Sequence, residues 1–308
     1  MIVSSILGLV GNTPIAELSR IHSGPGRILA KAEFLQPGGS VKDRAARKAI
    51  ELAYQDGRLI PQQPVVEMTS GNMGSALAAV CCVSGNPFIA TMSEGNSPER
   101  AKMMRGLGAE VILVPQVDGS PGKVTGKDIA AAIEIAIRIA KERNAFYVDQ
   151  FNNPASVLAH EQTTGPEIWN EIGREIGAFV ATVGSGGTFI GTARFLKSQN
   201  PAIVCAPVEP YGAEILAGRP VTKPDHVLQG TGYGLRPQFW EPALADVFLA
   251  VTDDEATAMR VELGRREGLY VGFSAAANVC AAKKLIARGR LGTNPTVVTV
   301  LCDTGLKY

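Results

Sequence analysis

The chain has 308 residues, of which 45% are hydrophobic, and its 30 basic and 29 acidic side chains give a formal net charge of +1. This length exceeds that of a usual single-core domain and favours two domains or one large α/β unit. The balanced charge, without a basic block, argues against nucleic acid and anionic membranes as partners. We expect no membrane span, because no apolar run is long enough, and no signal peptide, because the amino-terminal segment lacks a basic region.

Cysteine and histidine are few and scattered. The five cysteines form no CxxC pair and are Cys81, Cys82, Cys205, Cys280 and Cys302. The three histidines lie far apart in sequence, at His22, His160 and His226. We therefore expect no metal site and a reduced, cytoplasmic compartment. Most of the cysteines should be small buried apolar residues.

In the first half of the chain, short apolar runs alternate with longer helical patterns. Strands are predicted over Ile28–Phe34, Val65–Met68, Phe88–Met92, Glu110–Val114 and Ala145–Asp149. Helices are predicted over about Val41–Gln55, Asn72–Ser84, Ser97–Leu107 and Ile129–Arg143. Pro115–Lys127 is the most loop-like stretch.

The second half repeats this alternation. Strands are predicted over Ala178–Val183, Ile203–Val208 and Thr296–Cys302. Helices are predicted up to about Gln199 and over Asp254–Glu267 and Ala275–Arg288. Alternation of this kind predicts an α/β fold with parallel sheets covered by helices.

The segment PGGSVKDR, from Pro37 to Arg44, lies between a predicted strand and a predicted helix, so Lys42 falls in the first turn of that helix. A lysine with its ordinary pKa of about 10.4 is a poor nucleophile at neutral pH. The partial positive charge of a helix N-terminus disfavours the ammonium form and would assist imine formation. By itself, the segment fits a surface lysine without a special role equally well.

Two further strand-to-helix turns are rich in small residues. TSGNMG, from Thr69 to Gly74, suits a carboxylate, although an ordinary helix cap has the same composition. GSGGTFIG, from Gly184 to Gly191, can surround a phosphate with backbone and hydroxyl donors. Its spacing is neither that of a dinucleotide-binding turn nor that of a P-loop, which argues against NAD and ATP. Pyridoxal 5'-phosphate, an aldehyde with a phosphate, would use the lysine and both turns.

The ordered motifs resemble those of the fold-type II pyridoxal-phosphate enzymes, in particular the cysteine synthase (O-acetylserine sulfhydrylase) and cystathionine β-synthase branch. Besides the three turns, the resemblance includes VGNTP, DQFNNP, TTGPEIW, GTGYG, EGLYVGFSAAA and LCDTG. It implies two domains, each with a mostly parallel twisted sheet covered by helices. Residues 44–152 would form a smaller mobile domain that binds the substrate carboxylate, and residues 1–43 and 153–308 a larger cofactor-binding domain. A homodimer is also implied.

Carried over position by position, the resemblance implies roles for individual residues. Lys42 would be the Schiff-base lysine and, once released, the base that removes the substrate Cα proton. Asn72 would bond the phenolic oxygen of the cofactor, and Ser274 would face its pyridine nitrogen. The phosphate would be held by Gly184, Ser185, Gly186, Gly187 and Thr188. The substrate carboxylate would be bound at Thr69, Ser70, Met73 and Gln150.

The implied reaction is β-replacement, through an aminoacrylate, of O-acetylserine or O-phosphoserine with sulfide to make L-cysteine. A neutral serine at the pyridine nitrogen suits such chemistry, because it makes a weaker electron sink than an aspartate. Alternatives are cystathionine β-synthase, a synthase of another β-substituted alanine, or, in a different class, a catalytically idle homologue serving as a binding or regulatory subunit. The intact Lys42, Asn72 and Ser274 argue against the idle homologue.

Several positions depart from the common family pattern and leave the donor and the nucleophile open. Met73 stands in place of a threonine, Ala276 in place of a glycine and Ser185 in place of a threonine. Cys302 and Asp303 resemble a pair at the active-site mouth of B-type cysteine synthases, which accept nucleophiles bulkier than sulfide. Alternatively, Cys302 merely ends a buried strand and Asp303 caps a turn.

Overall fold

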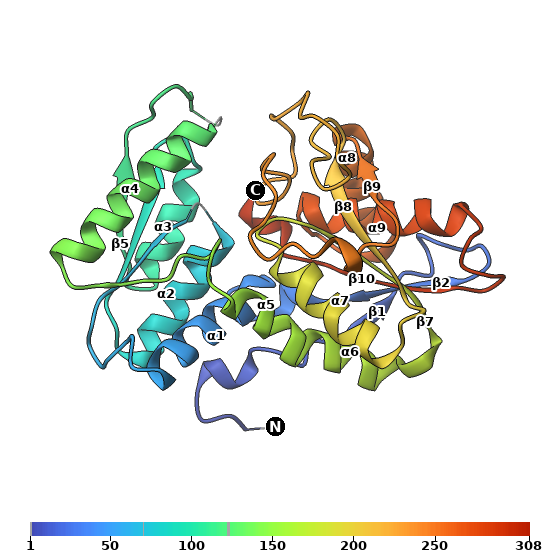
Figure 1. The fold of residues 1–308 in the computed structure, drawn as a ribbon, viewed down its shortest axis with the longest axis horizontal. Coiled ribbons are helices and arrows are strands. Elements are labelled where there is room, and N and C mark those ends of the chain that lie inside the picture. Colours follow the sequence, from blue (N-terminus) through green and yellow to red (C-terminus); the bar gives the residue numbers. More distant parts are fainter. Residues whose placement is uncertain (1, 70, 122–123) are drawn as a thin grey trace. The chain divides into compact units, whose positions relative to one another are not determined.

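The computed structural model describes residues 2–69, 71–121 and 124–308 (Figure 1). Contacts between residues divide the chain into two compact units. Unit 1 comprises Met1–Val10 and Gln36–Ala155, as far as they are described, together with Lys307. Unit 2 comprises Gly11–Leu35, Ser156–Leu306 and Tyr308. Among the described residues we found no helix with both the length and the apolar character needed to cross a bilayer.

Unit 1 is built on a parallel sheet with the strand order β5-β4-β3-β6. Its strands are β3 (Val65–Met68), β4 (Phe88–Ser93), β5 (Glu110–Val114) and β6 (Phe146–Tyr147). Its helices are α1 (Lys42–Gln55), α2 (Asn72–Ser84), α3 (Pro98–Gly106) and α4 (Gly126–Glu142). A short 3₁₀ helix, Ile6–Leu9, precedes them.

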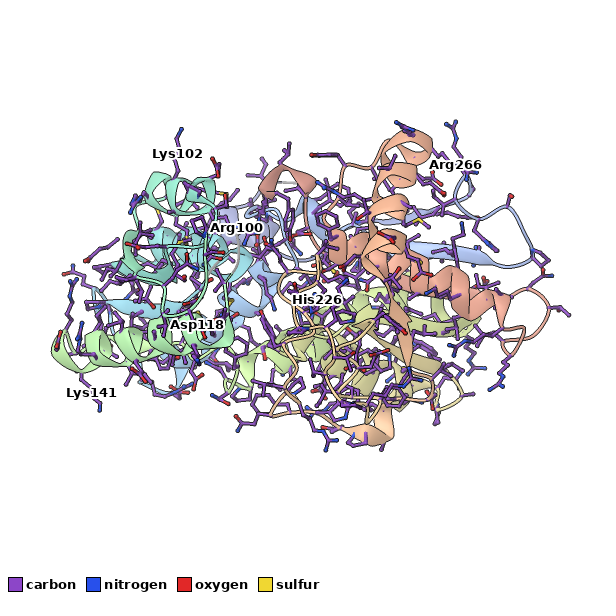
Figure 2. The ribbon with its side chains drawn as sticks, turned by 90° about the horizontal axis from the view of Figure 1, so that it is seen from above. Arg100, Lys102, Asp118, Lys141, His226 and Arg266 are labelled. Carbon is purple, nitrogen blue, oxygen red and sulfur yellow. The ribbon has the colours of Figure 1, made fainter. Side chains whose placement is uncertain are left out.

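The two faces of this sheet are covered by different helices. Val65 and Phe88 belong to an apolar cluster with residues of α1 and α2, whereas Val66 and Ile89 pack with residues of α4. This alternation is the two-residue period of a strand buried on both faces. Figure 1 accordingly shows α4 on one side of the sheet and α2 on the other. Exposed lysines lie on the outer surfaces of α3 and α4, as Lys102 and Lys141 show in Figure 2.

Unit 2 contains a second sheet, with the strand order β1-β2-β10-β7-β8-β9. Its strands are β1 (Ile15–Glu17), β2 (Arg27–Lys31), β7 (Ile176–Thr182), β8 (Val204–Pro210), β9 (Leu249–Val251) and β10 (Thr296–Val300). All neighbouring pairs are parallel except β1 and β2, which are antiparallel. The mostly parallel sheets of both units, covered by helices, confirm the predicted α/β class.

The helices of unit 2 also cover both faces of its sheet. They are α5 (Ala155–Ala159), α6 (Gly165–Ile172), α7 (Gly187–Gln199), α8 (Asp253–Glu262) and α9 (Phe273–Ala287). A π-helical turn, His160–Thr164, joins α5 to α6, and another, Leu263–Glu267, extends α8. Ala178 and Val180 of β7 belong to the apolar cluster that includes α9. Phe179, between them, stacks on Phe189 of α7 with ring centroids 6.2 Å apart.

Some elements differ from the sequence predictions. The predicted strand Ile28–Phe34 ends at Lys31, because a 3₁₀ turn occupies Glu33–Leu35. Neither of the three-residue strands β1 and β9 was predicted. The helical segment from Ala155 to Ile172 was also missed.

Candidate functional site

The predicted site residues follow the carboxyl ends of parallel strands in both units. In unit 1, Thr69 follows β3, and Gln150 comes after β6, the neighbour of β3 in the sheet. In unit 2, Gly184 follows β7. Loops that leave the carboxyl edge of a parallel sheet gather there and commonly bind ligands. The predicted residues therefore form two groups, one in each unit.

Lys42 is the first residue of α1, as the sequence predicted, and its side chain is half-buried. The turn before Lys42 is held by the next residue, Asp43, because the Asp43 carboxylate accepts a hydrogen bond from the backbone N–H of Gly38. A Cβ atom at Gly38 would lie only 2.7 Å from Asp43 Oδ1, so a larger residue there would displace the carboxylate that holds the turn. Lys42 thus follows a hydrogen-bonded turn at a helix N-terminus.

Thr69 and Gln150 lie at the carboxyl edge of the unit 1 sheet. The Thr69 hydroxyl oxygen accepts the backbone N–H of Gly74 at 2.8 Å, which closes the turn at the start of α2. The Gln150 side chain donates to the backbone oxygen of Met68 at 3.1 Å. The structure therefore brings these two predicted carboxylate-binding residues to neighbouring strand ends. Ser70, predicted with them, lies outside the described residues.

Glu67 is a fully buried carboxyl group beneath this edge, and the sequence reasoning missed it. Its Oε1 accepts the backbone N–H of Gln150 at 3.4 Å. Burial raises the pKa of Glu67 to about 8, although the hydrogen bonds from the Gln150 and Asp149 backbone oppose the shift. Burial of the Tyr147 side chain, together with the charges of Glu67 and Asp149, raises the pKa of Tyr147. At neutral pH the Glu67 carboxyl is therefore mostly protonated.

Asn72 opens α2, and its side chain has a partner that no local pattern indicates. Asn72 Oδ1 accepts a hydrogen bond from Lys307 Nζ at 2.8 Å. The same ammonium group donates to the backbone oxygen of Gly38 at 2.6 Å. All three residues belong to unit 1. Lys307 is separated from Asn72 by 235 residues, so no local sequence pattern could indicate this contact.

Met73, predicted beside the substrate carboxylate, directs its side chain into the apolar core of unit 1. It is 4% exposed and belongs to the same cluster as Leu77 and Met104. Its backbone is part of the first turn of α2. The residue thus contributes a buried side chain and a helix-terminal backbone group.

The predicted phosphate loop, Gly184–Thr188, is shaped by close backbone approaches. A Cβ atom at Gly184 would collide with the backbone oxygen of Gly230, and one at Gly187 would lie 2.5 Å from that of Ser156. Gly186 has a φ of +93°, which disfavours any side chain, and it precedes α7 as the N-cap. The backbone N–H groups at the start of this 13-residue helix form a site suited to an anion.

Thr188 of this loop contacts His160, which sequence reasoning did not place in the site. His160 is 2% exposed and lies in the π-helical turn between α5 and α6. Its Nε2 lies 3.3 Å from Thr188 Oγ1, and its Nδ1 lies 2.8 Å from Thr164 Oγ1. π-Helical turns are often found at functional sites.

Ser274 lies in the first turn of α9 and is 6% exposed. Asn278, one turn later, fixes this end of the helix to the sheet. Its Oδ1 accepts the backbone N–H of Thr182 at 2.6 Å, and its Nδ2 donates to the backbone oxygen of Val300 at 2.8 Å. These atoms end β7 and β10, so Ser274 and the loop that starts at Gly184 lie at the same edge of the unit 2 sheet.

Cys302 and Asp303 follow β10 at this edge. Asn278 Nδ2 also donates a hydrogen bond to Cys302 Sγ, at a distance of 3.3 Å. Asp303 is 1% exposed, and its Oδ2 accepts a hydrogen bond from the Tyr308 hydroxyl at 2.7 Å. A Cβ atom at Gly272, the N-cap of α9, would collide with Asp303 Oδ1. The pair therefore packs against the start of α9.

The other cysteines are mostly inert. Burial raises the pKa of Cys81 and of Cys205 to about 12 and also raises that of Cys280. These three thiols are buried, which confirms the expectation for most of the cysteines, whereas Cys82 is exposed. The Nε2 atom of His226, which is labelled in Figure 2, lies 3.0 Å from the backbone oxygen of Gly232.

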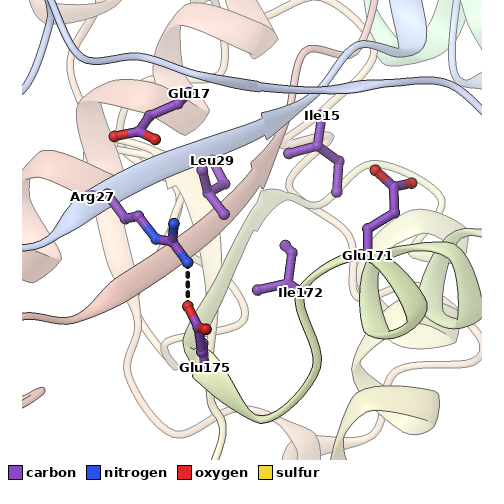
Figure 3. A pocket seen from close by; sticks show the side chains of 7 residues that line it. All are labelled: Ile15, Glu17, Arg27, Leu29, Glu171, Ile172 and Glu175. Atoms are coloured by element: carbon purple, nitrogen blue, oxygen red, sulfur yellow. Dashed lines mark hydrogen bonds and ion pairs between the residues drawn. The ribbon is translucent and has the colours of Figure 1, made fainter.

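A pocket of about 310 Å³ lies elsewhere in unit 2 (Figure 3). It is lined by Ile15, Glu17, Arg27, Leu29, Glu171, Ile172 and Glu175. Arg27 begins β2 and Glu175 immediately precedes β7, so the pocket lies at the amino ends of these strands. Its lining has three carboxylates but only one guanidinium, which is ion-paired with Glu175. This pocket therefore does not suit an anionic cofactor.

Comparisons with known proteins agree on one family. A family model described as "Pyridoxal-phosphate dependent enzyme" matches residues 6–303. Cysteine synthase 3 of Caenorhabditis elegans is 39% identical over 281 residues, covering 91% of this chain and 80% of that protein. The structure of an O-acetylserine-dependent cystathionine β-synthase from Helicobacter pylori has a TM-score of 0.90 and 35% identity, covering 100% of this chain and 97% of that one. The structure of an O-ureido-L-serine synthase has a TM-score of 0.90 and 32% identity, covering 100% of this chain and 94% of that one.

Proposed function

We propose a function from one premise: this chain belongs to the pyridoxal-phosphate-dependent enzymes, in the family of cysteine synthase. It is an enzyme whose cofactor is pyridoxal 5'-phosphate. Its reaction, in this proposal, is β-replacement on an O-activated L-serine, either O-acetylserine or O-phosphoserine. Sulfide replaces the acetate or phosphate group at Cβ, and the products are L-cysteine and the released acetate or phosphate.

The observation that best supports this proposal is the group of hydrogen-bond donors at the carboxyl edge of the unit 2 sheet. Neighbouring backbone approaches Gly184 and Gly187 so closely that no side chain fits at either position, and Thr188 adds a hydroxyl at the start of α7. Such a nest suits a phosphate dianion. Ser274 supplies a neutral hydroxyl at the same edge. These groups fit the phosphate and the ring nitrogen of the cofactor.

Unit 1 supplies the groups for the substrate and for the aldehyde of the cofactor. Lys42, in the first turn of α1, would carry the cofactor. Its Nζ, once released, would take the proton from the substrate Cα atom. The Thr69 hydroxyl, the Gln150 side chain and the turn at the start of α2 would bind the substrate carboxylate. Asn72 would donate to the phenolic oxygen of the cofactor.

When bound, the cofactor supplies an electron sink for the pair left at Cα after proton removal. Ser274 would keep that sink moderate, because a hydroxyl does not force a proton onto the ring nitrogen as a carboxylate would. Lys42 would hold the transferred proton and return it to Cα after the nucleophile has added. The buried apolar surroundings of α2 would limit the access of water to these steps.

A synthase of another β-substituted alanine is the second candidate. The likeness to an O-ureido-L-serine synthase over the whole chain favours it. Cystathionine β-synthase activity remains the other alternative within the family, given the likeness to the Helicobacter pylori enzyme. We also propose a homodimer in a reducing, cytoplasmic compartment, and the free cysteines support the reducing environment.

The test is a matrix of donors and nucleophiles assayed with the purified protein. O-acetylserine, O-phosphoserine and unmodified serine are each combined with sulfide, homocysteine or hydroxyurea, and products are identified by mass spectrometry. We expect L-cysteine from an O-activated serine and sulfide as the fastest reaction, and none with the Lys42→Ala variant. Faster turnover with another nucleophile would select one of the alternatives. No product from any combination would support the idle homologue.

A further inference from the structure

We propose that Lys307 is a positioning residue that orients the Asn72 amide toward the cofactor. The inference rests on the proposed function, which assigns Asn72 to the phenolic oxygen of pyridoxal 5'-phosphate. Its basis is the hydrogen bond of 2.8 Å from Lys307 Nζ to Asn72 Oδ1. Nothing in the sequence motifs around LCDTG or TSGNMG indicates this contact.

The chemistry of the two groups fixes the orientation of the amide. An ammonium group can only donate hydrogen bonds, whereas an asparagine amide accepts at Oδ1 and donates at Nδ2. A rotation of the amide by 180° would turn its NH₂ group toward the ammonium, which repels it. Lys307 therefore keeps Oδ1 on its own side and Nδ2 on the other. A phenolate oxygen needs such a donor, so the orientation that Lys307 imposes is the productive one.

The charge of Lys307 also strengthens the donor. Hydrogen bonds to a charged group are roughly twice as strong as neutral ones. An amide whose oxygen accepts from a cation is polarised, and its N–H groups become better donors. Lys307 is half-buried, so water screens this effect only in part.

The same ammonium group connects the segments that carry the two proposed cofactor ligands of unit 1. Lys307 Nζ donates to the backbone oxygen of Gly38, which belongs to the turn before Lys42, at 2.6 Å. The backbone N–H of Gly38 is in turn bound by Asp43, the residue after Lys42. Lys307 thus contacts both the turn that precedes α1 and the first residue of α2. Its loss should disturb the cofactor at the Asn72 contact more than at its covalent attachment.

The experiment compares Lys307→Met and Lys307→Arg with a matched control, Lys284→Met. Lys284 is also partly buried and donates both to a backbone oxygen, that of Ala250 at 2.9 Å, and to a side-chain oxygen, that of Glu255 at 2.6 Å. Two quantities are measured on each purified protein. One is the dissociation constant of pyridoxal 5'-phosphate, and the other is the ratio of the visible to the near-ultraviolet absorbance band of the bound cofactor, which reports where the phenolic proton resides.

We expect Lys307→Met to weaken cofactor binding by about ten-fold and to shift the absorbance ratio, since a charge-assisted hydrogen bond is lost. Lys307→Arg should restore most of both quantities, because arginine is also a cationic donor. Lys284→Met should lower the melting temperature while leaving the absorbance ratio at the wild-type value. Melting curves of the cofactor-free proteins check that each variant is folded.

A double-mutant cycle with Asn72→Ala separates a positioning role from a general one. If Lys307 acts through Asn72, Lys307→Met should have little further effect in the Asn72→Ala background. Equal effects in both backgrounds, or wild-type binding and absorbance in Lys307→Met, would overturn the inference. Wild-type protein that shows no cofactor absorbance would instead refute the proposed function, and the inference with it.

Discussion

The Nε2 atom of His160 lies 3.3 Å from the hydroxyl oxygen of Thr188, and the Nδ1 atom of the same ring lies 2.8 Å from the hydroxyl oxygen of Thr164. If Thr188 donates its hydrogen to a phosphate, its oxygen must accept from a protonated Nε2. In the neutral ring, Nδ1 then accepts from Thr164. A bound phosphate would thus favour one tautomer of a buried histidine.

The close packing of this loop leads to the first prediction. Gly187→Ala should destabilise the protein by about 1–3 kcal/mol and weaken cofactor binding, because the new Cβ would lie 2.5 Å from the Ser156 backbone oxygen. Gly126 is the matched control: it is likewise the first residue of a helix, and a Cβ there would meet no atom within 4 Å. Thermal unfolding and cofactor titration measure both effects. Equal behaviour of Gly187→Ala and Gly126→Ala would contradict the close approach.

The second prediction concerns the covalent attachment of the cofactor. Borohydride reduction of the protein with bound cofactor should fix the cofactor on Lys42, which peptide mapping by mass spectrometry can locate. Lys42→Ala should lose this label while retaining a folded structure, since the turn before α1 is held by Gly38 and Asp43. Lys48→Ala, on the same helix, serves as the control and should keep the label. A label on another lysine would remove Lys42 from its proposed role.

The third prediction follows from the buried carboxyl group of Glu67. Burial raises its pKa from an ordinary value of 4.5 to about 8 in the folded protein. Between these values the folded protein keeps a proton that the unfolded chain releases, so stability falls as the pH rises. The loss is at most about 1.4 kcal/mol per pH unit. It ends near pH 8, where the folded protein also releases the proton.

Glu67→Gln should flatten this dependence, because glutamine is neutral at every pH and can still accept from the Gln150 backbone. We expect wild type and variant to have similar melting temperatures near the lower end of this pH range, with the variant becoming progressively more stable toward the upper end. Glu134→Gln, at an exposed position on α4, should not change the slope. Parallel curves for wild type and Glu67→Gln would show that Glu67 is ionised throughout.

The fourth prediction concerns Met73, where the family pattern has a threonine. Met73→Thr should lower the concentration of O-activated serine needed for half-saturation. The reason is that the new hydroxyl would add a hydrogen bond of about 0.5–1.5 kcal/mol to the substrate carboxylate. Because Met73 is 4% exposed in the apolar core, the change should also cost about 2 kcal/mol or more of stability. Met73→Leu, which conserves volume, should alter neither by much. A stability loss without any change in half-saturation would leave Met73 a core residue only.

Elements governed by local patterns could be predicted from the sequence. The bounds of β3, β5 and α2 were predicted to the residue, since an apolar period and a following turn define each of them. In α2, for example, Gly85 ends the helix with a φ of +76°. The position of Lys42 in the first turn of α1 followed from the same reasoning and is confirmed.

Elements stabilised by distant contacts could not be predicted. The helical segment from Ala155 to Ile172 contains the sequence TTGP, which has low helix propensity. It is stabilised by packing against α7, where glycine permits the approach: a Cβ at Gly191 would collide with the backbone oxygen of Val157, and one at Gly165 would lie 2.7 Å from the Cβ of Phe195. The contacts of Asn278 and Lys307 are equally non-local, so their roles required the structure.

The short outer strands of the unit 2 sheet have a consequence for the behaviour of the protein at high concentration. β1 and β9, at its two edges, are three residues long, whereas β7 and β8 are seven residues long and are paired on both sides. Unpaired backbone groups on a sheet edge can recruit strands from other molecules, and a short edge offers few of them. The longest strands of this sheet are thereby shielded from intermolecular pairing, which disfavours aggregation by strand addition.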